Sequence, residues 1–477
     1  MSHHPLSSSS LRSFVLLLCL AAPAAAQAPR VEDLRYPPLH QFEIPRPERV
    51  VLDNGLVVLL LEDHELPLVE ATALVRAGSR LDPADKVGLA DLGSQVLRTG
   101  GTERMPSDQL DDWLESRAAS IEASTSADST RLTLSALAQD FPEALRVFAD
   151  VLRRPAFDTA RLEVSRNQAV ANVARQNDEP QQILFREFQE IVYGPESPYA
   201  ASETLASLRA IQRNDVVRWH RQSFHPDRIV VGLVGDFRTA DALRLLRETF
   251  GDWPPGPKAT DAEAPIRTQP TPGVFWVEKP DTQQSSLMLG HLGVRKDNPD
   301  FYSLEVLNYV LSGSFASRLR SEVRTKKGLA YSVDGRVASD WGHPSVAYLY
   351  TSTKTATTGA ALQALLDEAR GLRTRPPTVE EVDKAKQGIL SSFIFNVDTK
   401  REVLSQQLTF EFFGYPLDRL SRYRAGIEAV TVEQVRDAAV RHLRPEDFTI
   451  FVVGPAEGRD RPLTDFGQVT PVDVTIK

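Results

Sequence analysis

The sequence predicts an α+β protein made of two homologous halves, each an α/β sandwich in which a mixed or antiparallel sheet carries helices on one face. Three observations predict this class. A decapeptide recurs at a fixed offset, strand and helix signals do not strictly alternate, and a proline-rich segment lies between the two copies. With 477 residues, 42% of them hydrophobic, the chain is long enough to build more than one core.

The repeat relates residues 226–235 to residues 445–454, at an offset of 219. Pro-Asp-Arg-Ile-Val-Val-Gly-Leu-Val-Gly in the first copy becomes Pro-Glu-Asp-Phe-Thr-Ile-Phe-Val-Val-Gly in the second. Val216 and Val435 keep the same offset, each inside a predicted helix, and the second of these helices opens with the capping-box pattern Thr431-x-x-Gln434. A duplicated unit of about 220 residues follows.

In the first half, residues 55–61 form a continuous apolar run that predicts a buried strand. Residues 131–137 alternate between apolar and polar side chains, as a half-buried strand does. A helix then begins near Pro142, where a first-turn proline is tolerated, and ends at Pro155. Its apolar face has helical spacing, at Phe141, Leu145, Phe148 and Leu152.

The second half repeats these element types, with a strand predicted over residues 347–352 and a capped helix starting at Thr378. Between the halves, residues 253–273 contain too many prolines for helix or central strand and are predicted to form a linker. We therefore expect an N-terminal half at residues 27–252 and a C-terminal half at residues 274–477.

Residues 1–26 have the pattern of a secretory signal peptide, with Arg12 before an apolar run at residues 14–20 and alanines at 24–26 before the cleavage site. This predicts export across the inner membrane to the periplasm. The apolar run is too short to span a bilayer, so no transmembrane segment is expected in the mature chain. Cys19 offers an alternative, lipidation at a lipobox, but Leu17 and Leu18 stand where small residues are expected.

The formal net charge of −9 argues against nucleic acid as the main partner. Cys19 is the one cysteine, so after removal of the signal peptide stability rests on core packing and not on disulfides.

Residues 311–333 place Arg324 and Tyr331 seven apart across Gly328. Taken alone, such a pair would more often be an arginine in a surface ion pair and a core tyrosine. However, the surrounding segment closely resembles the Arg/Tyr element of the pitrilysin/insulinase family of zinc peptidases over some twenty positions.

The resemblance implies two halves that close like a clam shell, with the Arg324 guanidinium and the Tyr331 phenol donating hydrogen bonds to substrate carbonyls. Tyr331 would also stabilise the oxyanion of the tetrahedral intermediate. Ser312, Gly313 and Ser314 occupy the place of the family's small-residue loop, whose flexible backbone would contact the peptide.

The zinc motif that the resemblance leads one to expect is degenerate. After the lead-in at residues 88–90, the positions of His-x-x-Glu-His hold Asp91, Ser94 and Gln95, and the position of the third ligand, eight residues before Pro180, holds Asn172. Amides are poor zinc ligands, and a serine hydroxyl is not basic enough to activate water. We therefore expect no metal and no cofactor in this chain.

In two-chain members of the family, one subunit carries the zinc and the other carries the Arg/Tyr pair. This chain resembles the second kind. The hypothesis is a non-catalytic subunit of a heterodimeric metallopeptidase, inactive alone, that acts on unfolded peptides in trans to the zinc of a homologous His-x-x-Glu-His partner. Two alternatives remain open: a non-enzymatic peptide-binding or scaffold pseudopeptidase, and a metallopeptidase with unrecognised ligands.

Overall fold

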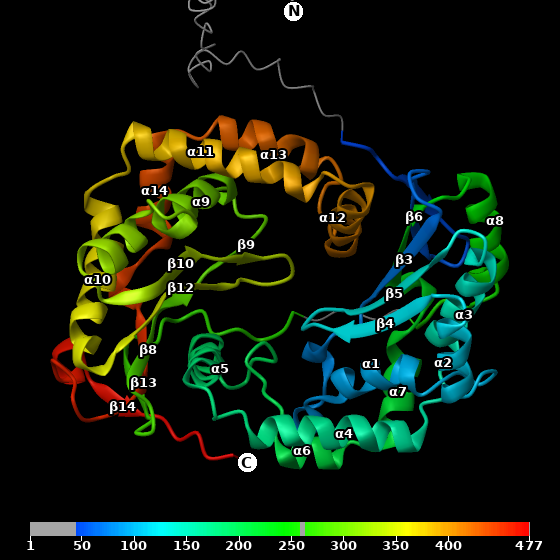
Figure 1. Cartoon of the computed structure of the whole chain (residues 1–477), viewed down its shortest axis with the longest axis horizontal. Helices are drawn as coiled ribbons and strands as arrows, with labels where there is room; N and C mark the ends of the chain where they lie inside the picture. Colours follow the sequence, from blue (N-terminus) through cyan, green and yellow to red (C-terminus); the bar gives the residue numbers. More distant parts are fainter. Residues whose placement is uncertain (1–43, 258–262, 477) are drawn as a thin grey trace, which may run out of the picture. The chain divides into compact units, whose positions relative to one another are not determined.

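The computed structural model describes residues 44–257 and 263–476. The predicted signal peptide, including Cys19, lies outside the described residues. Two six-stranded sheets dominate the fold, one built before residue 236 and the other after residue 272 (Figure 1).

The first sheet has the strand order β1-β2-β6-β3-β5-β4 and is mixed, because β2 and β6 run parallel while the other pairs are antiparallel. Its strands are β1 (Glu48–Val51), β2 (Val57–Glu62), β3 (Leu68–Val75), β4 (Ser120–Thr125), β5 (Thr130–Leu137) and β6 (Ile229–Gly235).

The second sheet has the order β14-β7-β13-β8-β12-β10, which repeats the first sheet strand for strand apart from β1 and β14. Its strands are β7 (Gly273–Glu278), β8 (Gln284–Leu292), β10 (Ala330–Val337), β12 (Val346–Lys354), β13 (Thr449–Gly454) and β14 (Val469–Pro471). Two short strands, β9 (Val294–Arg295) and β11 (Ser339–Asp340), pair in parallel beside it.

The helices of the first half are α1 (Leu89–Thr99), α2 (Ser107–Glu115), α3 (Phe141–Arg153), α4 (Thr159–Ala174), α5 (Pro180–Tyr193), α6 (Leu205–Ala210), α7 (Arg213–Ser223) and α8 (Thr239–Phe250). Those of the second half are α9 (Phe301–Asn308), α10 (Thr358–Thr374), α11 (Val379–Phe393), α12 (Lys400–Phe413), α13 (Arg419–Glu428) and α14 (Val432–His442). None of the described helices is long and apolar enough to cross a membrane.

The predicted duplication is confirmed. Helices α7 and α14 begin at Arg213 and Val432 and end at Ser223 and His442, so both bounds differ by the offset of 219 found in the sequence. In both halves the decapeptide forms a short 3₁₀ turn followed by a fully buried central strand, β6 or β13.

The elements expected from local patterns also form. The apolar run gives β2, the alternating segment gives β5, and the helix with Pro142 in its first turn is α3. The capping boxes at Thr378 and Thr431 open α11 and α14. The predicted linker differs at its ends, because Trp253 packs on Phe250 in the core of the first half and Gly273 already begins β7.

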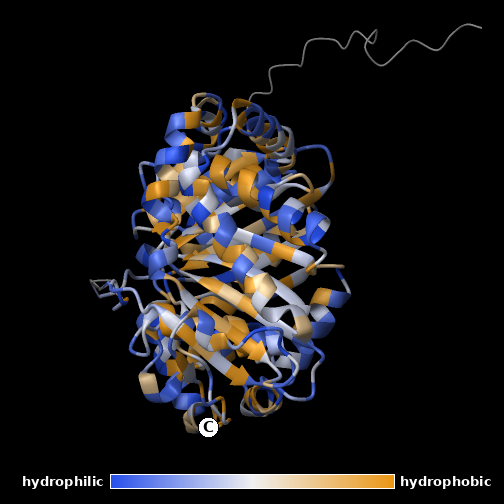
Figure 2. Ribbon diagram, turned by 90° about the vertical axis from the view of Figure 1, so that its left-hand side faces the viewer, coloured by the Kyte–Doolittle hydropathy of each residue, from blue (hydrophilic) through white to orange (hydrophobic). Residues whose placement is uncertain are grey.

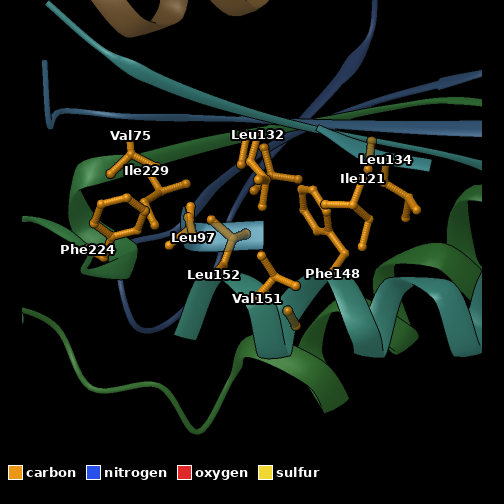
Figure 3. Packing of buried hydrophobic residues seen from close by; sticks show 14 of the residues in the cluster. Val75, Leu97, Ile121, Leu132, Leu134, Phe148, Val151, Leu152, Phe224 and Ile229 are labelled. Carbon is orange, nitrogen blue, oxygen red and sulfur yellow. The ribbon is translucent and has the colours of Figure 1, made fainter. Parts of the chain in front are cut away.

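Each half has its own core between the sheet and its helices. In the first half, Leu132 and Leu134 of β5 meet Phe148, Val151 and other residues of α3, as Figure 3 shows. Figure 2 shows hydrophobic residues along the strands, while the helices carry both hydrophobic and hydrophilic residues. These amphipathic helices cover one face of each sheet, as predicted.

The opposite face of each sheet is partly covered by a helix from the other half. Helix α12 lies on the first sheet, where Leu408 packs with Val230 and Val234 of β6 (Figure 1). Its counterpart α5 lies on the second sheet, where Phe188 packs with Phe451 of β13. This exchange buries apolar side chains of both halves in shared clusters and so joins the halves.

Candidate functional site

Arg324 lies in a π-helical segment, Arg320–Lys326, that leads through a tight turn into β10. The turn contains Gly328 at φ +61°, a left-handed conformation that favours glycine. The Gly328 N–H donates to the Arg324 carbonyl at 3.2 Å and the Leu329 N–H donates to the Val323 carbonyl at 2.9 Å. The turn therefore fixes the backbone of Arg324 against the start of β10.

Tyr331 lies at a β-bulge at the start of β10, which is the last strand of its sheet. Ala330 pairs with Thr353 and Val333 with Thr351, so one extra residue is inserted in β10. The bulge breaks the alternation of the strand, and both Tyr331 and Ser332 are exposed. The Tyr331 ring, 84% exposed, therefore points away from the core.

The Arg324 guanidinium lies over two exposed aromatic rings. Its central carbon lies 4.7 Å from the ring centre of Tyr331 and 5.6 Å from that of Phe315, and Phe315 is 76% exposed. Cation–π contacts of this kind hold a guanidinium in place while leaving its N–H groups free to donate. We call Phe315, Arg324 and Tyr331 the arginine–aromatic stack.

In the described part of the chain, Arg324 is not part of a surface ion pair, and Tyr331 is not a core tyrosine with a bonded hydroxyl. Within residues 44–257 and 263–476, no carboxylate pairs with Arg324 and the Tyr331 hydroxyl makes no hydrogen bond. Tyr331 is not a core residue. The structure brings the two side chains together, and both keep donors available for a ligand. Their role in binding a substrate stays a prediction.

Ser312 and Gly313 end a π-helical turn, Tyr309–Gly313, so the predicted flexible loop begins only at Ser314. Ser312 is buried, and its hydroxyl bonds to the Gly335 carbonyl at 2.6 Å and to Asp334 at 3.0 Å. Its side chain therefore anchors the turn to β10. Gly313 is exposed and Ser314 half-buried beside the stack, and a backbone contact from them to a peptide stays a prediction.

The four positions of the degenerate zinc motif do not form a ligand set. Ser94 is buried and donates to the Asp91 carbonyl at 2.9 Å, whereas Gln95 is exposed on the same helix, α1. Asn172 is exposed on α4 and accepts from Gln168 at 3.3 Å. The residues present do not fit zinc, since one carboxylate and two amides lack the nitrogen or sulfur ligands that the ion needs.

An acidic cavity of about 290 Å³ adjoins the start of α1 and is lined by Asp91 and Glu203. Asp82, which accepts from the N–H groups of Gly88 and Ala90 at 3.0 Å, lies nearby. Burial, reinforced by the charges of Asp91 and Asp82, raises the pKa of Glu203 to about 7. Burial also raises the pKa of Asp82 to about 6, and it raises the pKa of Asp91.

These raised pKa values predict a pH-dependent stability. Glu203 binds its proton more tightly in the folded chain than in the unfolded chain. Its contribution to the free energy of unfolding is therefore fully present below pH 4.5 and is lost as the pH rises through about 7. Glu203→Gln should therefore raise the free energy of unfolding at pH 8 by up to about 1 kcal/mol, since solvent screens this partly exposed carboxylate. Urea denaturation at pH 5 and pH 8 measures the difference.

The control is Glu196→Gln, which removes an exposed carboxylate a few residues away. It should change stability equally at both pH values. A Glu203→Gln chain that keeps the full wild-type pH dependence would rule out Glu203 as its source.

One cluster among the described residues has metal-ligand geometry, with oxygen and nitrogen atoms of Asp128, Asp340 and His343 within 4.8 Å of one another. Arg80 already pairs with Asp128 at 3.0 Å, and the Tyr199 hydroxyl donates to it at 3.1 Å. A guanidinium at this distance opposes a second cation. We therefore assign the cluster to joining the halves, because Asp128 lies before β5 and His343 lies before β12.

Comparison with known proteins decides the family. The model described as "Insulinase (Peptidase family M16)" matches residues 57–199, and the model described as "Peptidase M16 inactive domain" matches residues 210–389. The chain belongs to peptidase family M16. This confirms the resemblance found in the sequence and the α+β fold of two related halves.

Two proteins with sequences similar to this chain carry different names. The "non-peptidase homolog YmxG" of Helicobacter pylori is 26% identical over 399 residues, which cover 83% of this chain and 91% of that protein. The "uncharacterized zinc protease YmxG" of Bacillus subtilis is 24% identical, with 86% and 98% covered.

Two solved structures have the same fold as this chain. The peptidase M16 inactive domain from Pseudomonas fluorescens superposes with a TM-score of 0.80 at 26% identity, covering 88% of this chain and all of that one. The periplasmic protease PqqL of Escherichia coli gives 0.75 at 16% identity, with 94% of this chain and 51% of that chain covered.

The sequence did not predict that Phe315 stacks on Arg324 or that the pKa of Glu203 is raised. Phe315 carried one usable signal, an aromatic side chain directly after a Ser/Gly segment, where burial is not expected. Glu203 carried none, because its pKa depends on burial and on the charges of Asp91 and Asp82, which lie more than a hundred residues away in the chain.

Proposed function

We propose that this chain is a non-catalytic M16 subunit that binds unfolded peptides and supplies Arg324 and Tyr331 to the zinc site of a homologous partner. One observation carries the proposal. The arginine–aromatic stack presents donors that no described protein group uses, while α1 lacks a zinc-ligand set.

The chemistry of the two side chains supports this role. Arg324 presents a planar fork of N–H donors that suits a peptide carbonyl or carboxylate. Tyr331 offers an O–H donor aimed away from the core, and such a donor stabilises the negative charge that develops on a carbonyl oxygen under attack. A fixed donor of this kind acts mainly in the transition state and less on the bound substrate.

A peptide can bind in extended form at the sheet edges. Strands β4 and β10 end the two sheets, so each can pair its free backbone groups with an added strand. The bulge would place Tyr331 beside a peptide that pairs with β10. Because such pairing recognises the backbone of the peptide, the site would accept peptides of many sequences.

The zinc belongs to the partner in this proposal, and its role there is to polarise the scissile carbonyl and activate water. The partner is expected to be an M16 chain with an intact His-x-x-Glu-His motif. We place the complex in the periplasm, on the basis of the signal-peptide pattern in residues 1–26.

A second candidate is a peptide-binding pseudopeptidase without any catalytic partner. The name of the Helicobacter pylori relative, a non-peptidase homolog, favours it. It shares the stack and the sheet edges with the first proposal and differs only in the absence of hydrolysis.

The test is a pull-down of the tagged mature chain from its native envelope fraction, with the co-purifying proteins identified by mass spectrometry. Recovery of a homologous chain with His-x-x-Glu-His supports the two-chain peptidase. Recovery of the chain alone, able to bind peptide but without hydrolysis, would favour the pseudopeptidase.

A further inference from the structure

A second cavity lies between the first sheet and the exchanged helix α12. Its volume is about 330 Å³, near the lower end of the ~300–1,000 Å³ typical of ligand pockets. Strands β3, β4, β5 and β6 form its floor, and α12 forms its wall. We call it the α12 pocket.

Arg131 of β5 faces this pocket. Leu132 and Leu134, its neighbours in the strand, are buried in the core on the helix-covered face of the sheet. Because side chains alternate along a strand, Arg131 and Thr133 point to the opposite face, and both line the pocket. Arg131 is half-buried there, opposite Ser124 on one side and Leu74 on the other.

Arg131 has no carboxylate partner among residues 44–257 and 263–476. Arg401, the other arginine in the pocket, makes a bidentate pair with Glu70. A guanidinium that has lost part of its water without gaining an anion is destabilised, and burial accordingly lowers the pKa of Arg131. An anionic ligand would remove this penalty.

The carboxylates of the pocket are already engaged. Glu70 accepts from Arg401, and Glu402 accepts from the hydroxyl and the N–H of Thr399 at the start of α12. Hydroxyl groups supply most of the remaining polar lining, from Thr72, Ser120, Thr133, Ser135 and Ser405. One acidic side chain, Glu122, lies just outside, opposite Thr133 in the edge strand β4.

We infer that the α12 pocket binds a carboxylate of the peptide, with Arg131 as its ion-pair partner and the hydroxyls as neutral donors. This inference rests on the proposed peptide-binding function and assigns part of its specificity. A carboxylate is a planar, bidentate acceptor that a guanidinium matches. The volume admits a terminal residue or one acidic side chain, and the experiment distinguishes these two sources.

The experiment measures the binding of fluorescent peptides to the mature full-length chain by anisotropy. Three peptides are identical except at one position and at the C-terminus: the first ends in a free carboxylate, the second ends in an amide, and the third ends in an amide and carries a glutamate at the variable position. A charge-assisted hydrogen bond predicts that wild type binds one of the two acidic peptides about 10- to 100-fold more tightly than the neutral amide. Which acidic peptide is preferred identifies the source of the carboxylate.

Arg131→Gln should abolish this preference, so that all three peptides bind with similar affinity. The matched control is Arg146→Ala, which removes an exposed arginine on α3, on the other side of the sheet, and should keep the preference. Equal binding of all three peptides by wild type, or a preference that survives Arg131→Gln, would overturn the inference.

A second measurement applies if no peptide binds. N-acetylalanine should raise the melting temperature of the wild-type chain more than N-acetylalanine amide does, and this difference should vanish in Arg131→Gln. No difference in wild type would overturn the inference. The carboxylate pocket and the proposed role of Tyr331 can fail separately. A missing carboxylate preference would not change the effect of Tyr331→Phe on hydrolysis, and a Tyr331→Phe variant with normal hydrolysis would not change the carboxylate preference.

Discussion

Tyr331→Phe should lower the turnover number of the proposed two-chain complex by about 10- to 1,000-fold, because it removes one oxyanion donor. The phenyl ring remains, so its stacking on Arg324 at 4.7 Å is kept and only the hydroxyl is lost. Because this donor acts mainly in the transition state, kcat should fall with little change in KM. Steady-state kinetics on a quenched fluorescent peptide measures both.

Tyr350→Phe is the matched control, since this tyrosine packs against Phe185 under the exchanged helix α5, with ring centres 5.6 Å apart. It should leave kcat within about two-fold, because it removes no donor from the proposed site. A Tyr331→Phe complex with wild-type turnover would contradict the assigned role, whatever the control shows.

The second large effect concerns the exchange of helices that joins the halves. A Cβ added at Gly232 of β6 would lie 2.6 Å from a methyl carbon of Leu408 on α12, closer than packed side chains approach. Gly232→Ala should therefore lower the free energy of unfolding by about 1–3 kcal/mol. Leu408→Ala, at a side chain 1% exposed, should lower it by about 2–5 kcal/mol.

The double variant should lose less free energy of unfolding than the sum of the two single losses, because the shortened side chain at position 408 leaves room for the new methyl group. The difference should be about 0.5–3 kcal/mol. Leu365 is buried in the separate core of the second half. The effects of Leu365→Ala and Gly232→Ala on the free energy of unfolding should therefore be additive within error. Urea denaturation of the single and double variants gives both comparisons. Full additivity at positions 232 and 408 would mean that α12 does not pack on β6 in solution.

Local patterns predicted much of the fold because each depends on neighbours in the sequence. The decapeptide repeat fixed the correspondence of β6 with β13, and the spacing of Val216 and Val435 anticipated α7 and α14. Capping boxes located the starts of α11 and α14 to the residue. Each of these signals lies within a few residues of the structure that it specifies.

The exchange of α5 and α12 was not predictable in the same way. Both helices carry apolar residues, and a helix that is amphipathic shows that it packs on a sheet but not on which sheet. In a duplicated chain, each of these helices has two similar sheets available. The choice depends on contacts such as Phe188 with Phe451, which lie far apart in the sequence.

The candidate site was predicted in part. The motif around Arg324 and Tyr331 identified the pair, but the bulge that exposes Tyr331 depends on the register between β10 and β12. Arg131 was not identified, although it interrupts an otherwise neutral strand, because its lack of a partner depends on the pairing of Glu70 with Arg401. Sequence patterns give the type of group, whereas tertiary contacts decide whether it is free.

The most direct test of the central claim is peptide hydrolysis by the isolated mature chain and by its complex with a zinc-bearing M16 partner, each before and after chelation. We predict no hydrolysis by the isolated chain, and hydrolysis by the complex that stops on chelation and returns with zinc. Chelator-sensitive hydrolysis by the isolated chain, or a stable complex that cleaves no peptide, would contradict the account.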